Sequence, residues 1–270
     1  MTDDRGTVKQ PIGVFDSGLG GLTVLRSLID LVPEEPIVYF GDTGRFPYGP
    51  KPAEEVLQYA IEIGDLLVDR GARLLVVACN SAAAAALAEL QARLPIPVVG
   101  VIEPGVRAAQ QATRNGRVGV IGTIGTVASG AYQRVAAELA PDIEVTCVAC
   151  PGFVEFVEAG DVDSEQVHVL AQRLLAPARA ADVDTLVLGC THYPLLARTI
   201  GDVMGREVVL VSSADETAFM VRELLGAGRS GAAPPARHTF LTSGDVATFR
   251  HLGARFLGPE VEAVEAWSWS

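Results

Sequence analysis

Two cysteines, Cys79 and Cys190, each follow an aliphatic run and precede hydrogen-bonding side chains. The first stands in LLVVACNS at 74–81 and the second in LVLGCTH at 186–192. Such runs are typical of strands buried on both faces. A thiol at the junction of a strand with a helix N-terminus gains a lowered pKa, and free N–H groups there can hold an anion. Two thiols in matched settings predict a reaction that needs two similar acid–base groups.

These cysteine turns require parallel strands that alternate with helices. Strands are expected at 12–15, 37–40, 74–79, 95–100, 117–121, 143–150, 186–189 and 208–211. Helices are expected at 22–31, 53–69, after 81, after 104, at 153–158, 164–180 and 214–225, with a flexible connection at 226–235. Residues 237–270 should add a short strand, a short helix and an edge formed by Trp267 and Trp269. The alternation predicts an α/β fold with doubly wound parallel sheets.

The strand-turn-helix pattern repeats along the chain. Gly13 and Gly119 occupy like places in two strands, and their separation nearly equals that of Cys79 and Cys190. The repeat predicts two pseudosymmetric α/β domains with the active site in the cleft between them, although common α/β packing can also produce such an offset. We expect one domain from residues 1–101 plus 214–270 and the other from 102–213.

Composition excludes several classes of function. The net charge of -12 and pI near 4.8 argue against a general nucleic-acid surface. The sequence has no signal peptide and no apolar run of the ~20 residues that a membrane span needs, so we expect a cytoplasmic protein with free thiols. Its two lysines, Lys9 and Lys51, are poorly placed for a pyridoxal-phosphate Schiff base.

Other polar residues gather at expected strand ends. Asp16 opens a glycine-rich turn, DSGLGG at 16–21, whose spacing does not fit a dinucleotide-binding GxGxxG motif. The loop at 41–49 is either a packed turn or a substrate lid. His192 is a candidate acid or base. Glu158 is a surface acid or a site carboxylate, and sequence alone favours the surface.

The CxxC pair Cys147 and Cys150 allows a redox or zinc interpretation. A thioredoxin-type pair begins a helix, and a zinc ribbon needs a second CxxC, which the sequence lacks. We therefore expect packed strand cysteines and no metal site.

Four motifs, taken together, carry a family resemblance. They are Phe15-Asp-Ser-Gly-Leu-Gly-Gly21, Pro47-Tyr-Gly49, Ala78-Cys-Asn-Ser-Ala82 and Gly189-Cys-Thr-His-Tyr-Pro194. In this order they closely resemble the glutamate racemase family. The resemblance implies a cofactor-independent isomerase of two pseudosymmetric α/β domains, usually a homodimer, that supplies D-glutamate for peptidoglycan, and hence for cell wall biogenesis and cell shape. Some members inhibit DNA gyrase, but this acidic sequence offers no motif for that activity.

The resemblance also assigns roles by position. Cys79 and Cys190 match the two catalytic cysteines, and Asp16, Glu158 and His192 resemble supporting catalytic groups. The expected substrate-binding residues are Asp16, Ser17, Asp42, Tyr48, Gly49, Asn80, Ser81, Thr123, Thr191 and His192. Ser81 stands where threonine is more usual, and it keeps the hydroxyl. Cys147 matches no family role.

The residues and the resemblance meet in a two-base hypothesis. One cysteine thiolate removes the α-proton of glutamate while the other thiol protonates the opposite face. Aspartate or hydantoin racemase of the same superfamily is the nearest alternative, and an amino-acid assay panel would separate them. A non-catalytic α/β binding protein would keep its ligand affinity after both cysteines are replaced, and a CxxC redox enzyme would need a reductant.

Overall fold

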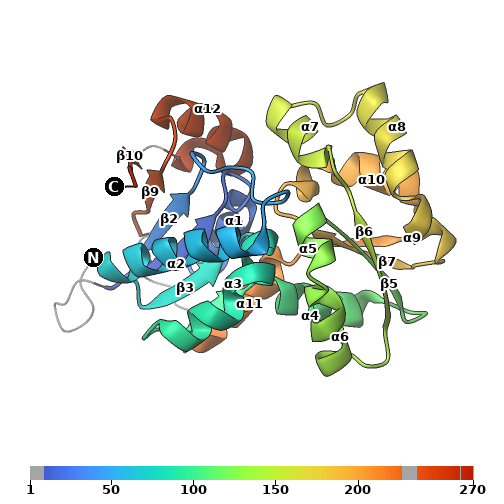
Figure 1. The fold of residues 1–270 in the computed structure, drawn as a ribbon, viewed down its shortest axis with the longest axis horizontal. Coiled ribbons are helices and arrows are strands. Elements are labelled where there is room, and N and C mark those ends of the chain that lie inside the picture. The colour runs from blue at the N-terminus through green and yellow to red at the C-terminus, as the bar shows by residue number, and fades with distance from the viewer. Residues whose placement is uncertain (1–8, 227–235, 262, 270) are drawn as a thin grey trace.

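The computed structural model describes residues 9–226, 236–261 and 263–269, which form two lobes around two all-parallel sheets (Figure 1). The six-stranded sheet has the order β10-β9-β2-β1-β3-β4, and the four-stranded sheet has the order β6-β5-β7-β8. The strands are β1 (Ile12–Asp16), β2 (Ile37–Gly41), β3 (Leu74–Val77), β4 (Val98–Gly100), β5 (Arg117–Gly122), β6 (Glu144–Ala149), β7 (Thr185–Gly189), β8 (Val209–Val211), β9 (Thr239–Thr242) and β10 (Val264–Ala266). Most of the connection expected at 226–235 lies outside the described residues.

Helices separate most successive strands. They are α1 (Leu22–Leu31), α2 (Ala53–Asp69), α3 (Asn80–Arg93), α4 (Ile102–Ala112), α5 (Ile124–Ala128), α6 (Ala131–Leu139), α7 (Phe153–Ala159), α8 (Glu165–Leu174), α9 (Ala176–Ala180), α10 (Ala197–Met204), α11 (Ala214–Leu224) and α12 (Val246–Leu257), with 3-10 turns at η1 (Tyr193–Leu196) and η2 (Gly258–Glu260). The strand pairs in the described residues are parallel, as an α/β fold with crossover helices requires.

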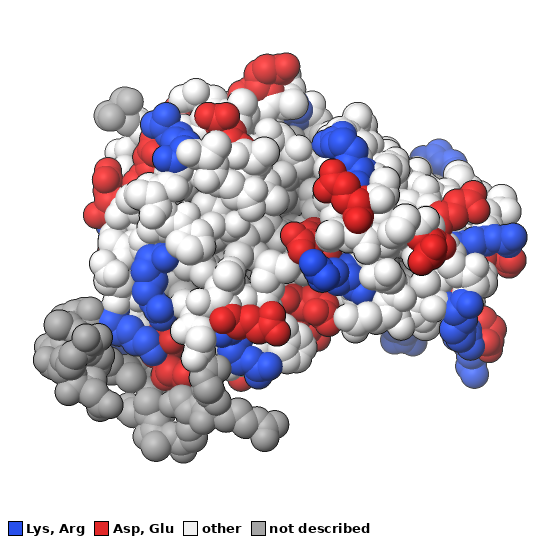
Figure 2. Space-filling view, turned by 90° about the horizontal axis from the view of Figure 1, so that it is seen from below, with Lys and Arg blue, Asp and Glu red and all other residues white. Residues whose placement is uncertain are grey.

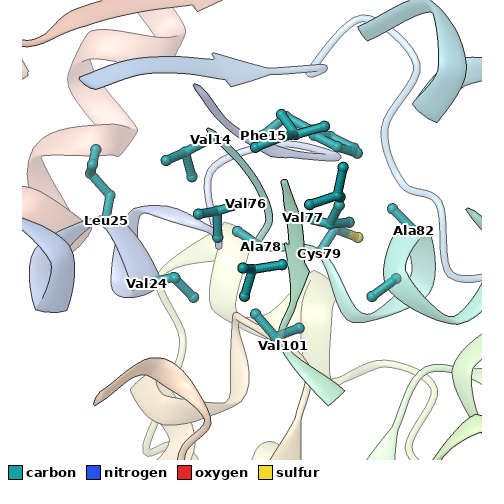
Figure 3. Packing of buried hydrophobic residues seen from close by; sticks show 14 of the residues in the cluster. Val14, Phe15, Val24, Leu25, Val76, Val77, Ala78, Cys79, Ala82 and Val101 are labelled. Atoms are coloured by element: carbon teal, nitrogen blue, oxygen red, sulfur yellow. The ribbon is translucent and has the colours of Figure 1, made fainter. Parts of the chain in front are cut away.

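The central strands are buried on both faces. Every residue of β1, β3 and β7 is buried, which explains their continuous aliphatic sequences. Figure 3 shows Val14 and Phe15 of β1 beside Val76 and Val77 of β3, with Cys79 at the end of this packed group. The hydrophobic packing of the first sheet therefore fixes the place where the Cys79 turn begins.

One apolar cluster connects the two lobes. It contains the core of the six-stranded sheet together with Val120 of β5, Tyr132 of α6 and Val187 of β7. A second cluster, which includes Phe153, Leu186 and Tyr193, fills the outer side of the four-stranded sheet. The shared core limits how far one sheet can shift against the other.

The helix expected at 164–180 is wrong in one respect, because the chain forms two helices there. α8 ends at Leu174, and α9 begins at Ala176 with Pro177 in its first turn. Proline has no N–H to continue the preceding helix, but it fits a first helical turn, where that N–H needs no partner. Pro104 occupies the first turn of α4 for the same reason.

Residues 239–269 contribute two further strands to the first lobe. β9 pairs with β2, and β10 forms the edge next to β9. Trp267 and Trp269 follow this edge strand with their rings in contact. The domain boundaries expected after residues 101 and 213 fall just before α4 and α11 and stay a prediction.

Charged side chains of both signs lie next to one another on the face shown in Figure 2. In the described part of the chain, no helix is both long enough and apolar enough to cross a membrane.

Replacing Phe153 with alanine should lower the free energy of unfolding by about 3–5 kcal/mol, because it opens a cavity in the second cluster. The Phe153 side chain is fully buried, and its ring packs edge-on against Tyr193 at 5.4 Å between centroids. Urea unfolding measures the change. Val169→Ala is the matched control, since Val169 is 58% exposed, and it should change stability by no more than about 0.5 kcal/mol. Equal losses in the two variants would contradict the assignment of Phe153 to the core.

Candidate active site

A cavity lies between the two lobes, at the carboxyl ends of strands from both sheets. Ligands of open α/β sheets bind at this edge because loops and helix N-termini converge there. The lining residues are Ser17, Phe46, Pro47, Tyr48, Gly49, Pro50, Cys79, Asn80, Ser81, Thr123, Ile124, Cys150, Pro151, Gly152, Val154, Glu155, Cys190, Thr191, His192 and Tyr193.

Most of the site residues expected from the sequence line this one cavity. They are Ser17, Tyr48, Gly49, Cys79, Asn80, Ser81, Thr123, Cys190, Thr191 and His192. Asp16, Asp42 and Glu158 do not line the cavity but hydrogen-bond to side chains that do. The two cysteines come from different lobes, since Cys79 caps α3 after β3 and Cys190 directly follows β7.

The Cys79 thiol lies in a buried, acidic setting. Its Sγ donates to Ser17 Oγ at 3.6 Å, and only 5% of the residue is exposed. Burial, reinforced by the nearby Asp16 carboxylate, raises the pKa of Cys79 to about 12. The lowered pKa expected for a thiol at a helix N-terminus is therefore wrong for Cys79, because desolvation outweighs the favourable backbone N–H groups. Cys79 is a protonated thiol at neutral pH.

The Cys190 thiol lies beside a cation instead. Its Sγ is 3.9 Å from His192 Nδ1, and His192 Nε2 is 2.7 Å from Glu158 Oε1. Burial alone lowers the pKa of His192, but the hydrogen bonds to Cys190 and Glu158 raise it overall to about 10. His192 is thus an imidazolium at neutral pH, which donates from both nitrogens and stabilises negative charge on the neighbouring sulfur.

Glu158 is held in the site rather than on the free surface. Its side chain is 23% exposed and pairs with the nearly buried His192. The surface position that the sequence favoured is therefore wrong, because α7 turns this carboxylate toward the loop after β7. His192, the hydrogen-bond partner of Glu158, is 34 positions away in the chain.

Asp16 connects the two lobes from behind the cavity. Its Oδ2 accepts from Thr191 Oγ1 at 3.4 Å, and its Oδ1 accepts from the Gly18 N–H at 3.3 Å. Burial raises the pKa of Asp16, although the His192 charge opposes that shift. The carboxyl group therefore orients Thr191 next to Cys190. Its negative charge also raises the pKa of the Cys79 thiol.

The glycine-rich turn after β1 allows the two lobes to approach each other closely. A Cβ atom placed on Gly20 would clash with Thr191 Oγ1 and would lie 2.5 Å from His192 Nδ1. Only glycine leaves room for the loop that follows β7 to approach so closely. The glycine at position 20 is therefore needed so that the two lobes can pack together beside the cavity.

Asp42 organises the loop at 41–49. Its carboxylate accepts from Tyr48 Oη, from Arg45 Nε at 2.6 Å and from Ser243 Oγ at 2.6 Å. Trp269 Nε1 donates to the same group at 3.3 Å, and its ring lies 3.9 Å from the Arg45 guanidinium carbon. Asp42 is fully buried, so these donors compensate its charge and fix Tyr48 against the cavity. The loop is thus a packed turn that also lines the site.

Sequence reasoning missed several side chains at the cavity. Cys150 follows β6 and lines the cavity, and burial raises its pKa to about 12. Its position after a strand, like that of Cys79, was a signal that could have found it. The His192 ring packs against Phe46 and Phe256, each at 5.9 Å between centroids, and no motif in the sequence indicated these contacts. Cys147 lies within β6, half-buried and unbonded to another cysteine.

Both lysines of the chain form ion pairs with acidic side chains. Lys9 pairs with Glu35 at 2.7 Å and Lys51 with Glu55 at 2.9 Å, and neither lysine lines the cavity. The described residues contain no cluster of three or more His, Cys, Asp or Glu side chains arranged to hold a metal ion.

A family model for Asp/Glu/hydantoin racemases matches residues 12–221, so the chain belongs to this family of racemases. The chain is 54% identical over 254 residues to glutamate racemase from Acidothermus cellulolyticus, covering 93% of this chain and 96% of that protein. It is equally identical over 258 residues to glutamate racemase from Mycobacterium tuberculosis, covering 94% and 95%. The chain therefore belongs to the glutamate racemase family and is an isomerase, as its motifs indicated.

Solved structures confirm the predicted fold class. Glutamate racemase isoform RacE1 from Bacillus anthracis superposes with a TM-score of 0.90 at 42% identity, covering 97% of each chain. Glutamate racemase from Francisella tularensis in complex with D-glutamate gives a TM-score of 0.88 at 33% identity, covering 96% of this chain and 98% of that one.

The pKa of His192 should be about 10 in the protein, and Glu158→Gln should lower it by removing the carboxylate. This value exceeds the ordinary histidine pKa of about 6.5. The hydrogen bonds of protonated His192 with Cys190 and Glu158 therefore stabilise the folded protein fully below pH 6.5, and this stabilisation is lost as the pH rises through 10. Histidine NMR titration measures the pKa directly. Glu155→Gln, on the same helix, is the control and should leave His192 unchanged. An unperturbed His192, titrating near its ordinary pKa in the original protein, would contradict this assignment.

Proposed function

We propose that this protein interconverts L- and D-glutamate by a cofactor-independent two-base reaction in which Cys79 and Cys190 act on opposite faces of the α-carbon. The observation that carries the proposal is that both thiols line one cavity although they follow strands of different sheets, Cys79 after β3 and Cys190 after β7. A single base would have to cross the plane of the substrate between deprotonation and reprotonation. Two fixed groups avoid that movement.

The two sulfurs have different environments, which suggests how the reaction starts. Cys190 next to the His192 imidazolium is the group suited to act as a thiolate base. Cys79, whose pKa is raised to about 12, is suited to donate a proton. After one turnover the protonation states of the two thiols are exchanged. Proton exchange with water restores them before the next turnover in the same direction, and the reverse reaction starts from the exchanged state. We assign His192 with Glu158, and Asp16, to tuning or relaying these protons.

Removal of a proton beside a carboxylate is the difficult step, and each tenfold gain in rate requires about 1.4 kcal/mol of transition-state stabilisation. Hydrogen-bond donors aimed at the substrate oxygens supply such stabilisation when water is excluded. Ser17, Asn80 and Thr191 are buried polar residues at the cavity. The Ser81 hydroxyl lies 2.9 Å from Thr123 Oγ1 on the opposite lobe. We propose that these groups bind the substrate carboxylates, together with Tyr48 and Gly49.

Glutamate as the substrate is supported by the relatives, whose names specify glutamate, and by the Francisella tularensis structure with bound D-glutamate. The proposed product, D-glutamate, would enter peptidoglycan synthesis and thus cell wall biogenesis. The proposed enzyme is a cytoplasmic homodimer.

Cys79→Ser and Cys190→Ser should each reduce racemization by about 10²–10⁴-fold in both directions, because a serine hydroxyl is a much weaker acid–base group than a thiol. Chiral chromatography of glutamate measures the rates. Cys147→Ser is the matched control, since this thiol lies outside the cavity, and it should retain activity. Full activity in either cavity variant would reject the two-thiol mechanism.

A further inference from the structure

Tyr132 connects the two cysteine turns from the interior of the protein. It belongs to α6 in the second lobe and is 1% exposed. Its hydroxyl donates to Asn80 Oδ1 at 2.7 Å, and Asn80 directly follows Cys79 in the first lobe. Its ring covers Gly189, the residue before Cys190, since a Cβ atom there would lie 3.2 Å from Tyr132 Cε2. One side chain thus touches both catalytic turns.

The hydrogen bond determines which end of the Asn80 amide is available. Asn80 lines the cavity and is 3% exposed. With Oδ1 bonded to Tyr132, the free donor of the amide is Nδ2, which has no acceptor among the described residues. An amide turned by 180° would present Oδ1 instead, and a carbonyl oxygen repels a carboxylate.

The hydroxyl of Tyr132 favours one amide orientation. Within the described residues, its only hydrogen bond is the one to Asn80. If the amide turned over, the buried O–H would lose its acceptor, which carries a desolvation penalty. Burial also raises the pKa of Tyr132 far above its ordinary value, so the group stays protonated and remains a donor.

We propose that Tyr132 is a positioning residue, which holds the Asn80 amide so that Nδ2 donates to a carboxylate oxygen of the substrate. This inference rests on the proposed function, which places glutamate in the cavity. Because Tyr132 and Asn80 belong to different lobes, the orientation of the amide depends on how the lobes are held together (Figure 1). Tyr132 acts on the substrate only through Asn80.

A double-mutant cycle with Tyr132→Phe, Asn80→Ala and the double variant tests this dependence. Tyr132→Phe keeps the ring against Gly189 and removes only the hydroxyl. It should raise the KM for L- and D-glutamate about tenfold with a smaller change in kcat, since ground-state binding loses an oriented donor. Asn80→Ala should raise KM at least as much, and adding Tyr132→Phe to it should cause no further change.

Thr199→Val is the control for loss of a buried hydroxyl. Thr199 Oγ1 donates to the Val162 carbonyl at 2.7 Å and lies away from the cavity, so this variant should keep the original KM. Thermal unfolding verifies that every variant is folded. An unchanged KM in Tyr132→Phe, or effects of the two substitutions that multiply in the double variant, would overturn the proposal. Lack of glutamate racemization by the original protein would instead reject the proposed function.

Discussion

The structure depends on one constraint, which is that groups that follow strands of two separate sheets must be held in one cavity. Closeness in the sequence cannot bring the two thiols together, because Cys79 and Cys190 lie far apart in the chain. Buried contacts between the lobes supply the connection, among them Asp16 with Thr191, Asn80 with Tyr132 and Ser81 with Thr123. The backbone adds a bond from the Gly125 N–H to the Gly49 carbonyl at 2.9 Å. The residues that pack the two lobes together therefore also place the Cys79 and Cys190 turns.

Electrostatics distinguish two thiols that the sequence presents as equivalent. Cys79 is buried beside the carboxyl group of Asp16, whereas Cys190 faces an imidazolium that Glu158 stabilises. A pseudosymmetric arrangement of strands thus contains an asymmetric arrangement of charge. This asymmetry suits the proposed reaction, which needs one thiol protonated and the other ionised. Asp16 ends β1 beside Cys79, whereas His192 lies in the turn after β7 beside Cys190.

Local patterns in the sequence were sufficient to predict most of the elements. The helices at Leu22–Leu31 and Ala53–Asp69 begin and end where their apolar periodicity predicts, and the strands before both cysteines follow from their aliphatic runs. The break at Pro177 was missed because the apolar pattern continues through it. Contacts of Glu158 with His192, and of Asp42 with Ser243 and Trp269, could not be predicted from residue types, because each depends on how distant segments pack. The raised pKa of Cys79 was missed for the same reason, since burial depth is set by the whole fold.

The central claim is that two groups on opposite faces exchange different protons with the substrate. Isotope incorporation during the first few per cent of conversion of L-glutamate in deuterium oxide tests it most directly. The D-glutamate formed should carry deuterium at the α-carbon while the remaining L-glutamate keeps its original hydrogen, because the proton taken by one thiol is not the one delivered by the other. D-glutamate that retains the substrate's own α-hydrogen would contradict this account and would indicate a single base.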